Sequence, residues 1–184
     1  MNKLILIALE QEAPHMANWP NVFFTGVGKV NAAIIAAKLI ERYNPDMVIN
    51  FGTAGGITLD KGIHEIKNFI QRDMKCCELG CEIGQTPFED CTFISTSGST
   101  SLMMLEGYTC STGDNFVNGP QDNPVISDVV DMEAYAIAKA CKRADVTFKC
   151  FKYISDNADE NANEDWAKTV ADGEKHYMRI YERL

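Results

Sequence analysis

The sequence predicts an α/β fold with three layers, α/β/α, around a mixed, mostly parallel central sheet. Apolar runs of strand length alternate along the chain with amphipathic stretches of helix length. Several of these runs are apolar throughout, which is typical of strands covered by helices on both faces. At 184 residues, the chain is long enough for a sizeable core, and we expect one domain over residues 1–184.

The N-terminal part predicts three strands and one helix. Lys3–Leu9 resembles the apolar core of a signal peptide, but acids follow at once and no small-residue cleavage site is present, so a strand is the better interpretation. A short strand is expected at Asn21–Thr25 and a buried one at Asp46–Phe51. Between them lies a predicted helix from Val30 to Tyr43, ended by Asn44-Pro45. Its expected buried stripe is Val30, Ala33, Ile34, Ala37 and Ile40.

The middle of the chain is less regular. His64–Ile70 and Cys91–Thr96 are predicted strands, whereas Leu102–Leu105 is ambiguous between strand and helix. The stretch from Arg72 to about Asp90 contains Gly and Pro and lacks periodicity. It is long for a connection in a compact domain, which favours a functional role or contact with a partner.

The C-terminal part returns to the alternation of strands and helices. Tyr108–Ser111 and Asp128–Asp131 are predicted strands, and a helix is expected over Met132–Arg143. Thr147–Ser155 is the last predicted strand. One long helix, Glu164 to Arg183, is expected to close the chain.

Composition excludes several classes of partner. The formal net charge is −9, from 17 Lys and Arg against 26 Asp and Glu, which argues against a nucleic-acid backbone or an anionic membrane surface. No apolar run approaches the ~20 residues of a membrane-spanning helix. The seven cysteines are an odd number and fit reduced thiols in a cytoplasmic protein. Cys76, Cys77, Cys81 and Cys91 match no zinc spacing, so we expect neither a metal nor a cofactor.

Acidic residues follow three of the predicted strands. Glu12 lies beyond the first strand, Glu133 beyond the strand Asp128–Asp131, and Asp156 beyond the last strand. Ligands of α/β proteins bind at the carboxyl ends of strands, so these carboxylates are expected around one small molecule. For the cluster that holds Glu12, the start of a solvated short helix is the alternative.

Glycines mark two further segments. Gly26-Val27-Gly28-Lys29 lacks the spacing of a phosphate loop, and a tight strand-to-helix turn is the better interpretation. That turn is expected to direct backbone N–H groups at a ligand. Gly52-Thr53-Ala54-Gly55-Gly56 allows either a close approach of backbone to a ligand, at Gly55 for example, or a sharp turn. Thr53 adds a hydroxyl there.

This set of residues suits cleavage of a nucleoside N-glycosidic bond. One ionised carboxylate suits the ribose hydroxyls, a protonated one donates to the departing base, and a third takes a proton from water. Phe116 offers a ring on which a base stacks. Water is favoured over phosphate as the nucleophile, because every arginine except Arg72 lies on a predicted helix.

Five segments in order extend this interpretation to a family: Gly26-Val27-Gly28-Lys29-Val30-Asn31-Ala32-Ala33, Asn50-Phe51-Gly52-Thr53-Ala54-Gly55-Gly56, Thr112-Gly113-Asp114-Asn115-Phe116-Val117, Asp131-Met132-Glu133-Ala134 and Ile154-Ser155-Asp156. Together they resemble the 5′-methylthioadenosine/S-adenosylhomocysteine nucleosidases of the purine nucleoside phosphorylase superfamily. The resemblance implies a nucleoside phosphorylase-like fold and a cytoplasmic homodimer that hydrolyses adenine nucleosides.

The resemblance also implies a role for each matching residue. Glu12 deprotonates the attacking water, and Asp156 donates a proton to the departing base. The implied substrate-binding residues are Thr53 near the water, Phe116 and Val117 at the adenine, Met132 and Glu133 at the ribose, and Ser155 beside the acid.

The chain departs from the family pattern at several positions. It is short, and Asp131 and Lys152 stand where the family has Glu and commonly Arg. Trp166 replaces the Phe of the lid over the base. The stretch from Arg72 to Thr86 differs from the one that caps the 5′ substituent in the neighbouring subunit. Four alternatives therefore stay open: a phosphorylase, a nucleosidase of other 5′ specificity, a non-catalytic nucleoside-binding protein, and an α/β protein whose acids are merely solvated.

Overall fold

The computed structural model describes residues 2–98 and 105–184. The ambiguous segment Leu102–Leu105 lies outside this range except for its last residue. Every strand expected from the sequence is present: β1 (Lys3–Ile7), β2 (Val22–Phe24), β3 (Met47–Gly56), β4 (Gly62–Gln71), β5 (Phe93–Ser95), β6 (Tyr108–Thr112), β7 (Val129–Asp131) and β8 (Thr147–Asp156). The α-helices are α1 (Lys29–Tyr43), α2 (Ala134–Ala144), α3 (Ala162–Thr169) and α4 (Glu174–Tyr181). Short 3-10 helices include η1 (Glu10–Glu12) and η2 (Pro14–Met16).

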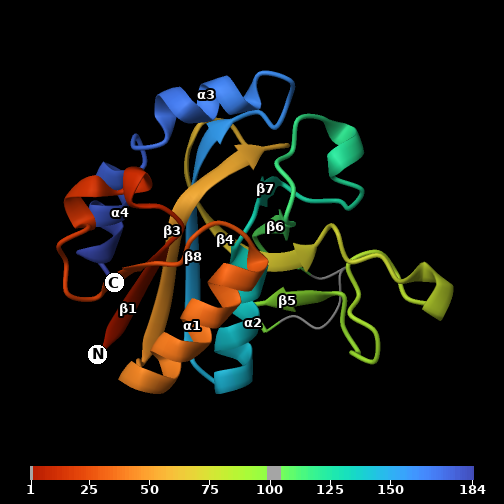
Figure 1. The fold of residues 1–184 in the computed structure, drawn as a ribbon, viewed down its shortest axis with the longest axis horizontal. Helices are drawn as coiled ribbons and strands as arrows, with labels where there is room; N and C mark the ends of the chain where they lie inside the picture. The colour runs from red at the N-terminus through yellow and green to blue at the C-terminus, as the bar shows by residue number, and fades with distance from the viewer. Residues whose placement is uncertain (1, 99–104) are drawn as a thin grey trace.

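The strands form one mixed sheet that closes on itself. Its order is β2-β1-β3-β7-β6-β4-β5, and β8 pairs with both β3 and β4. Five strands, β3, β7, β6, β4 and β8, therefore form a closed ring. The pairings β3–β7, β4–β8 and β4–β5 are antiparallel, and the other five are parallel. Where the sequence predicts three layers, α/β/α, around a mixed, mostly parallel central sheet, the structure has a mixed sheet that closes like a barrel (Figure 1).

The glycine-rich segment after Phe51 explains part of this closure. The sequence allows a close approach to a ligand or a sharp turn at Gly52–Gly56; the sharp turn is wrong, because the strand continues to Gly56 and pairs with β7 and β8 at its end. Its register against β8 shifts between Ala54 and Gly55. Glycine lets a strand bend and lets other chains approach closely. At Gly56 a side chain would lie 2.4 Å from the carbonyl of Leu59.

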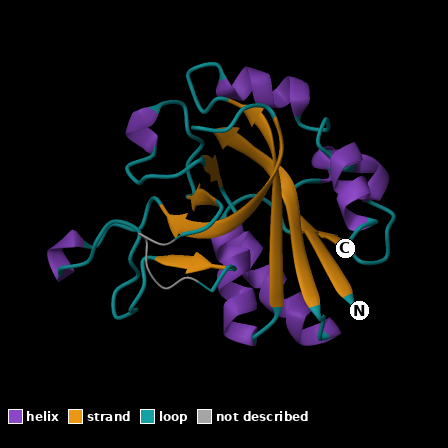
Figure 2. Ribbon diagram, turned by 180° about the vertical axis from the view of Figure 1, so that it is seen from behind, coloured by secondary structure: helices purple, strands orange, loops and turns teal. Residues whose placement is uncertain are grey.

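Successive apolar residues along the strands point to opposite faces of the sheet and pack into two separate cores. Leu4, Leu6 and Val48 belong to a core that also contains residues of α1 and α2. Ile5 and Ile49 belong to a second core with Met16 of η2 and Tyr177 of α4. Figures 1 and 2 show α1 and α2 side by side, and α4 apart from them beside β1. The long strands are therefore packed on both faces.

The buried face of α1 differs from the predicted stripe. Ala32, Ala36, Leu39 and Ile40 are buried, whereas Val30 and Ile34 are 67% and 59% exposed. Two of the buried residues are alanines, which let the helix pack closely on its neighbours, and the other two are the larger Leu39 and Ile40. The predicted stripe and the buried residues share Ile40 alone, so the helical periodicity is confirmed but the predicted face is wrong.

The predicted C-terminal helix is divided into α3 and α4. The break includes Gly173, where a side chain would lie 2.4 Å from the Tyr177 hydroxyl. The buried Tyr177 ring packs against Phe51, with ring centroids 4.9 Å apart. The division places α4 on the core and α3 across the carboxyl ends of β3 and β8 (Figure 1). None of the helices in the described ranges has the length and apolar character of a bilayer-spanning segment.

Candidate active site

One cavity of about 200 Å³ lies at the carboxyl ends of the strands. Every site residue expected from the sequence lines it: Glu12, Thr53, Gly55, Phe116, Val117, Met132, Glu133, Ser155, Asp156 and Trp166. The long strands β3 and β8 bring Thr53, Gly55, Ser155 and Asp156 together, because their registers place Gly55 opposite Asp156. Segments separated by more than a hundred residues therefore form one site.

Glu12 ends η1 and is buried, with 3% of its surface exposed. Its Oε1 accepts hydrogen bonds from the backbone N–H and the hydroxyl of Thr53, both at 2.8 Å. Its Oε2 accepts one from the Leu9 N–H at 3.0 Å. A carboxylate has about four acceptor positions, so one position on Oε2 remains for another donor among the described surroundings. The alternative of a solvated helix start is wrong for Glu12, whereas Glu10 is exposed.

Glu133 stands at the N-terminus of α2 and is also buried. Its Oε1 accepts a hydrogen bond from the Gly28 N–H at 2.8 Å, and the Lys29 N–H donates to Asp114 at 2.7 Å. The turn at Gly26–Lys29 therefore binds carboxylates of the protein, where the sequence predicts that it faces a ligand. Burial, and next the nearby Asp131, raise the pKa of Glu133 to about 7.

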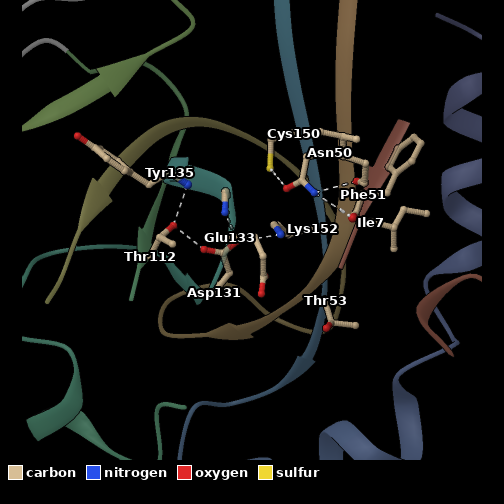
Figure 3. A network of polar contacts seen from close by, with 12 residues as sticks. Ile7, Asn50, Phe51, Thr53, Thr112, Asp131, Glu133, Tyr135, Cys150 and Lys152 are labelled. Atoms are coloured by element: carbon tan, nitrogen blue, oxygen red, sulfur yellow. Dashed lines mark hydrogen bonds and ion pairs between the residues drawn. The ribbon is translucent and has the colours of Figure 1, made fainter. Parts of the chain in front are cut away.

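Asp131 and Lys152 form a buried ion pair beside Glu133, with Nζ 2.8 Å from Oδ2. Asp131 also accepts hydrogen bonds from the Thr112 hydroxyl at 2.6 Å and the Ala134 N–H at 2.8 Å. Figure 3 shows this network, with Thr112 and Lys152 on either side of Asp131. Burial opposes the charge of Asp131, but Lys152 and the other donors hold its pKa below the usual value. The two departures from the family pattern are thus partners in one pair.

Asp156 ends β8 in a different environment. Its Oδ2 accepts a hydrogen bond from the Ser155 hydroxyl at 2.7 Å, and its Oδ1 one from the Ala158 N–H at 2.9 Å. Burial raises the pKa of Asp156 despite these bonds, and the acids Asp159 and Asp165 add to the rise. A side chain at Gly55 would lie 2.8 Å from Oδ1. Glycine is therefore required for Asp156 to reach this position.

Three less polar residues complete the lining. Phe116 is 39% exposed and presents its ring at the cavity, whereas Val117 is buried against Val130 and Ala158. Met132 is partly buried between Asp131 and Glu133. An exposed aromatic ring at a cavity is available to stack on a planar ligand.

Arg72 is a site residue that the sequence analysis missed. It is 1% exposed and follows β4 directly. Its guanidinium donates to the carbonyls of Ser111 at 2.8 Å, Asp131 at 2.7 Å, Gly113 at 3.2 Å and Asn115 at 2.5 Å. It thereby fixes the segment that leads to Phe116. A charged residue directly after a buried strand was the available signal, the same one that identified Glu12 and Asp156.

The model of the Phosphorylase superfamily matches residues 18–97 and 103–184 of the chain. The fold and the match to this family model show that the chain belongs to the Phosphorylase superfamily. The 5′-methylthioadenosine/S-adenosylhomocysteine nucleosidase of Shewanella pealeana is 31% identical over 173 residues, which cover 83% of this chain and 74% of the relative. The chain belongs to the 5′-methylthioadenosine/S-adenosylhomocysteine nucleosidase family within that superfamily.

Solved structures agree on the fold. A Helicobacter pylori MTAN mutant with 5′-methylthioadenosine in its active site superposes with a TM-score of 0.86 at 20% identity, covering 100% of this chain and 99% of that one. A futalosine hydrolase mutant of the same species gives 0.85 at 21% identity, with 100% of both chains covered. The fold is thus shared by enzymes with differently named substrates.

Proposed function

We propose that the protein hydrolyses the N-glycosidic bond of adenine nucleosides such as 5′-methylthioadenosine and S-adenosylhomocysteine. The products are adenine and the 5′-substituted ribose. The observation that carries this proposal is the convergence of Glu12, Glu133 and Asp156 on one cavity. The relatives named for these two substrates support the same assignment.

In the proposed reaction, Glu12 is the general base. Its Oε2 keeps one acceptor position for the attacking water, while the three donors from Thr53 and Leu9 hold the carboxylate in place. The oxygen of this water bonds to C1′ of the ribose and its proton passes to Glu12. The transition state resembles an oxocarbenium ion, so positive charge builds on the sugar.

Asp156 is the proposed general acid. Its raised pKa favours the protonated form, which donates its proton to a ring nitrogen of the departing adenine. The electron pair of the broken bond between C1′ and adenine stays on the adenine, and the proton from Asp156 neutralises the resulting negative charge. Phe116 stacks on the adenine, and Val117 offers its backbone groups. Ser155 orients the acid through its hydrogen bond to Oδ2.

Glu133 is the proposed ligand of the ribose 2′ and 3′ hydroxyls, with Met132 beneath the sugar. The ionised carboxylate accepts from two hydroxyl groups at once. The adjacent pair of Asp131 and Lys152 holds the start of α2, because Asp131 accepts from the Ala134 N–H. The binding residue is therefore supported by a rigid charge pair.

The hydrogen bonds of Arg72 favour water over phosphate as the nucleophile. This arginine lines the cavity, but its two terminal nitrogens already donate to four backbone carbonyls. The four terminal N–H groups are therefore committed to the protein, and only the buried Nε is left without a partner among the described residues. This supports hydrolysis over the phosphorolytic alternative.

The test is incubation with 5′-methylthioadenosine, S-adenosylhomocysteine, 5′-deoxyadenosine, adenosine, inosine and futalosine, with and without phosphate. Free base and the sugar product are measured by chromatography. We expect adenine release that does not depend on phosphate. A sugar 1-phosphate would identify a phosphorylase, and release of no base from any nucleoside would exclude the enzyme.

We further propose that the protein is a cytoplasmic homodimer of a single domain. Apolar side chains are exposed on α1, at Val30 and Ile34, and in the 72–90 stretch, at Leu79 and Phe88. Such surfaces are typical of interfaces. Sedimentation of the wild-type chain beside Ile34→Glu tests this: the wild type is expected to sediment as a dimer and the variant as a monomer.

A further inference from the structure

Helix α3 contacts the end of β3, which carries Thr53, and the end of β8, which carries the proposed acid Asp156. Near its centre, the indole Nε1 of Trp166 donates to the Thr53 hydroxyl at 3.0 Å. At its C-terminus, the Thr169 hydroxyl lies 3.0 Å from the Ser155 carbonyl and 2.9 Å from the Asp165 carbonyl of its own helix, and can donate to either. The helix thus extends from the partner of Glu12 to the residue that precedes Asp156.

Through Thr53, the hydrogen bond of Trp166 is linked to Glu12, the proposed general base. An indole N–H is a donor only, so the Thr53 oxygen acts as the acceptor in that bond. The single hydroxyl hydrogen of Thr53 is then directed elsewhere, and Glu12 Oε1 lies 2.8 Å away. Trp166, Thr53 and Glu12 therefore form a chain of two hydrogen bonds with one direction. Successive bonds of this kind strengthen each other.

This chain determines which oxygen of Glu12 is left for water. Both donors from Thr53 converge on Oε1, so the open acceptor position stays on Oε2. If the Thr53 hydroxyl turned away, Oε1 would keep only the backbone donor and would compete for the water. The orientation of one hydroxyl group therefore affects the alignment of the base.

We propose that Trp166 is a positioning residue for hydrolysis, which orients Glu12 toward the attacking water through the Thr53 hydroxyl. The inference rests on the proposed function and extends it: the residue that covers the cavity also aligns the base. A phenylalanine at this position would cover the site but would have no hydrogen to donate. Glu12 is therefore fully aligned only when α3 lies over the cavity.

A double-mutant cycle tests the proposal. Trp166→Phe keeps an aromatic cover and removes the donor, and Thr53→Val keeps the shape of the side chain and removes the hydroxyl. We expect Trp166→Phe to lower kcat about 3- to 10-fold, as for one hydrogen bond, with KM within about twofold. In the Thr53→Val background, Trp166→Phe should cost no further activity. Additive losses, or an unchanged kcat in Trp166→Phe, would overturn the proposal.

Two controls accompany the cycle. Thr53→Ser keeps a hydroxyl and should retain the coupling to Trp166. Trp19→Phe removes the other indole, which packs on Tyr181 away from the cavity, and should leave kcat unchanged. Thermal unfolding of each variant separates misfolding from a lost alignment. If the wild type releases no base, the proposed function fails; if it is active and the losses are additive, only the role of Trp166 fails.

Fluorescence gives a second readout that does not require Thr53→Val to fold. In the Trp19→Phe variant, Trp166 is the remaining tryptophan of the sequence, which has two. Titration with adenine should change its emission, because the base binds under the indole. Constant emission at saturating adenine, with binding shown by calorimetry, would show that the indole does not cover the bound adenine and would contradict the proposal that one residue both covers the cavity and aligns Glu12.

Discussion

Glu12 and Asp156 line the same cavity, but the protein surrounds these two carboxyl groups differently. Three donors contact Glu12, all from backbone or a hydroxyl group of fixed orientation. Two donors contact Asp156, and burial together with the neighbouring Asp159 and Asp165 raises its pKa. These different surroundings fit the proposed roles, with Glu12 as the proton acceptor and Asp156 as the proton donor. Surroundings, more than residue type, separate the two roles.

Asp156→Asn breaks the acid side of this comparison and carries the largest expected effect. Loss of the general acid should lower kcat by about 10²–10⁴-fold, whereas binding of 5′-methylthioadenosine survives because the amide still makes hydrogen bonds. Adenine release and isothermal calorimetry measure the two quantities. Glu160→Gln, an exposed acid nearby, is the control. Turnover at the wild-type rate in Asp156→Asn would refute the assigned role.

Glu12→Gln breaks the base side. We expect kcat to fall by about 10²–10³-fold. Unlike Asp156→Asn, this variant should also be less stable, by about 1–3 kcal/mol, because the amide NH₂ meets donors of Thr53 or Leu9 and a buried polar group stays unsatisfied. Thermal unfolding of both variants decides the point. Equal stability of the two would show that the difference in their surroundings is unimportant.

Lys152→Met extends the comparison to Asp131, whose charge is balanced by a cation. Removal of one partner from a buried ion pair leaves an uncompensated charge and costs about 3–5 kcal/mol. Denaturant unfolding measures the loss. Lys149→Met on the same strand removes a partly exposed contact to Glu65 and should change stability by less than about 1 kcal/mol. Similar losses in both variants would argue against the importance of the buried pair.

The raised pKa of Glu133 gives the last prediction, which has the smallest expected effect. Folding raises it from an ordinary value of 4.5 to about 7, so the unfolded chain loses this proton at lower pH than the native protein. The contribution of Glu133 to stability is complete below pH 4.5 and is lost as the pH rises through about 7. Ionised Glu133 is the better acceptor for ribose hydroxyls.

Nucleoside affinity should therefore rise by up to about tenfold between pH 6 and pH 8, as one charge-assisted hydrogen bond forms. Calorimetry with the slowly reacting Asp156→Asn variant measures it without turnover. Adding Glu133→Gln should remove the pH dependence. An affinity that stays constant from pH 6 to pH 8 in the Asp156→Asn variant would contradict the raised pKa.

The sequence predicted the existence and order of the strands because apolar runs and helical periodicity are local signals. It also predicted the gathering of Glu12, Glu133 and Asp156, since the carboxyl ends of strands meet at one edge. It did not predict the pairing of Asp131 with Lys152, although each was noticed separately. Asp131 ends β7 and Lys152 lies on β8, two strands that both pair with β3. Their contact therefore depends on the closure of the sheet, and neither segment alone contains this information.

By itself, then, the sequence determined which segments form strands and helices, although not where each begins and ends. It also determined the acidic residues that follow the strands, and the family. The tertiary structure decided the closed ring of strands, the inward face of α1, and the division of the last helix at Gly173. It also decided that Trp166 contacts Thr53. These features depend on side-chain size and on contacts between distant segments, which periodicity and spacing along one chain do not contain.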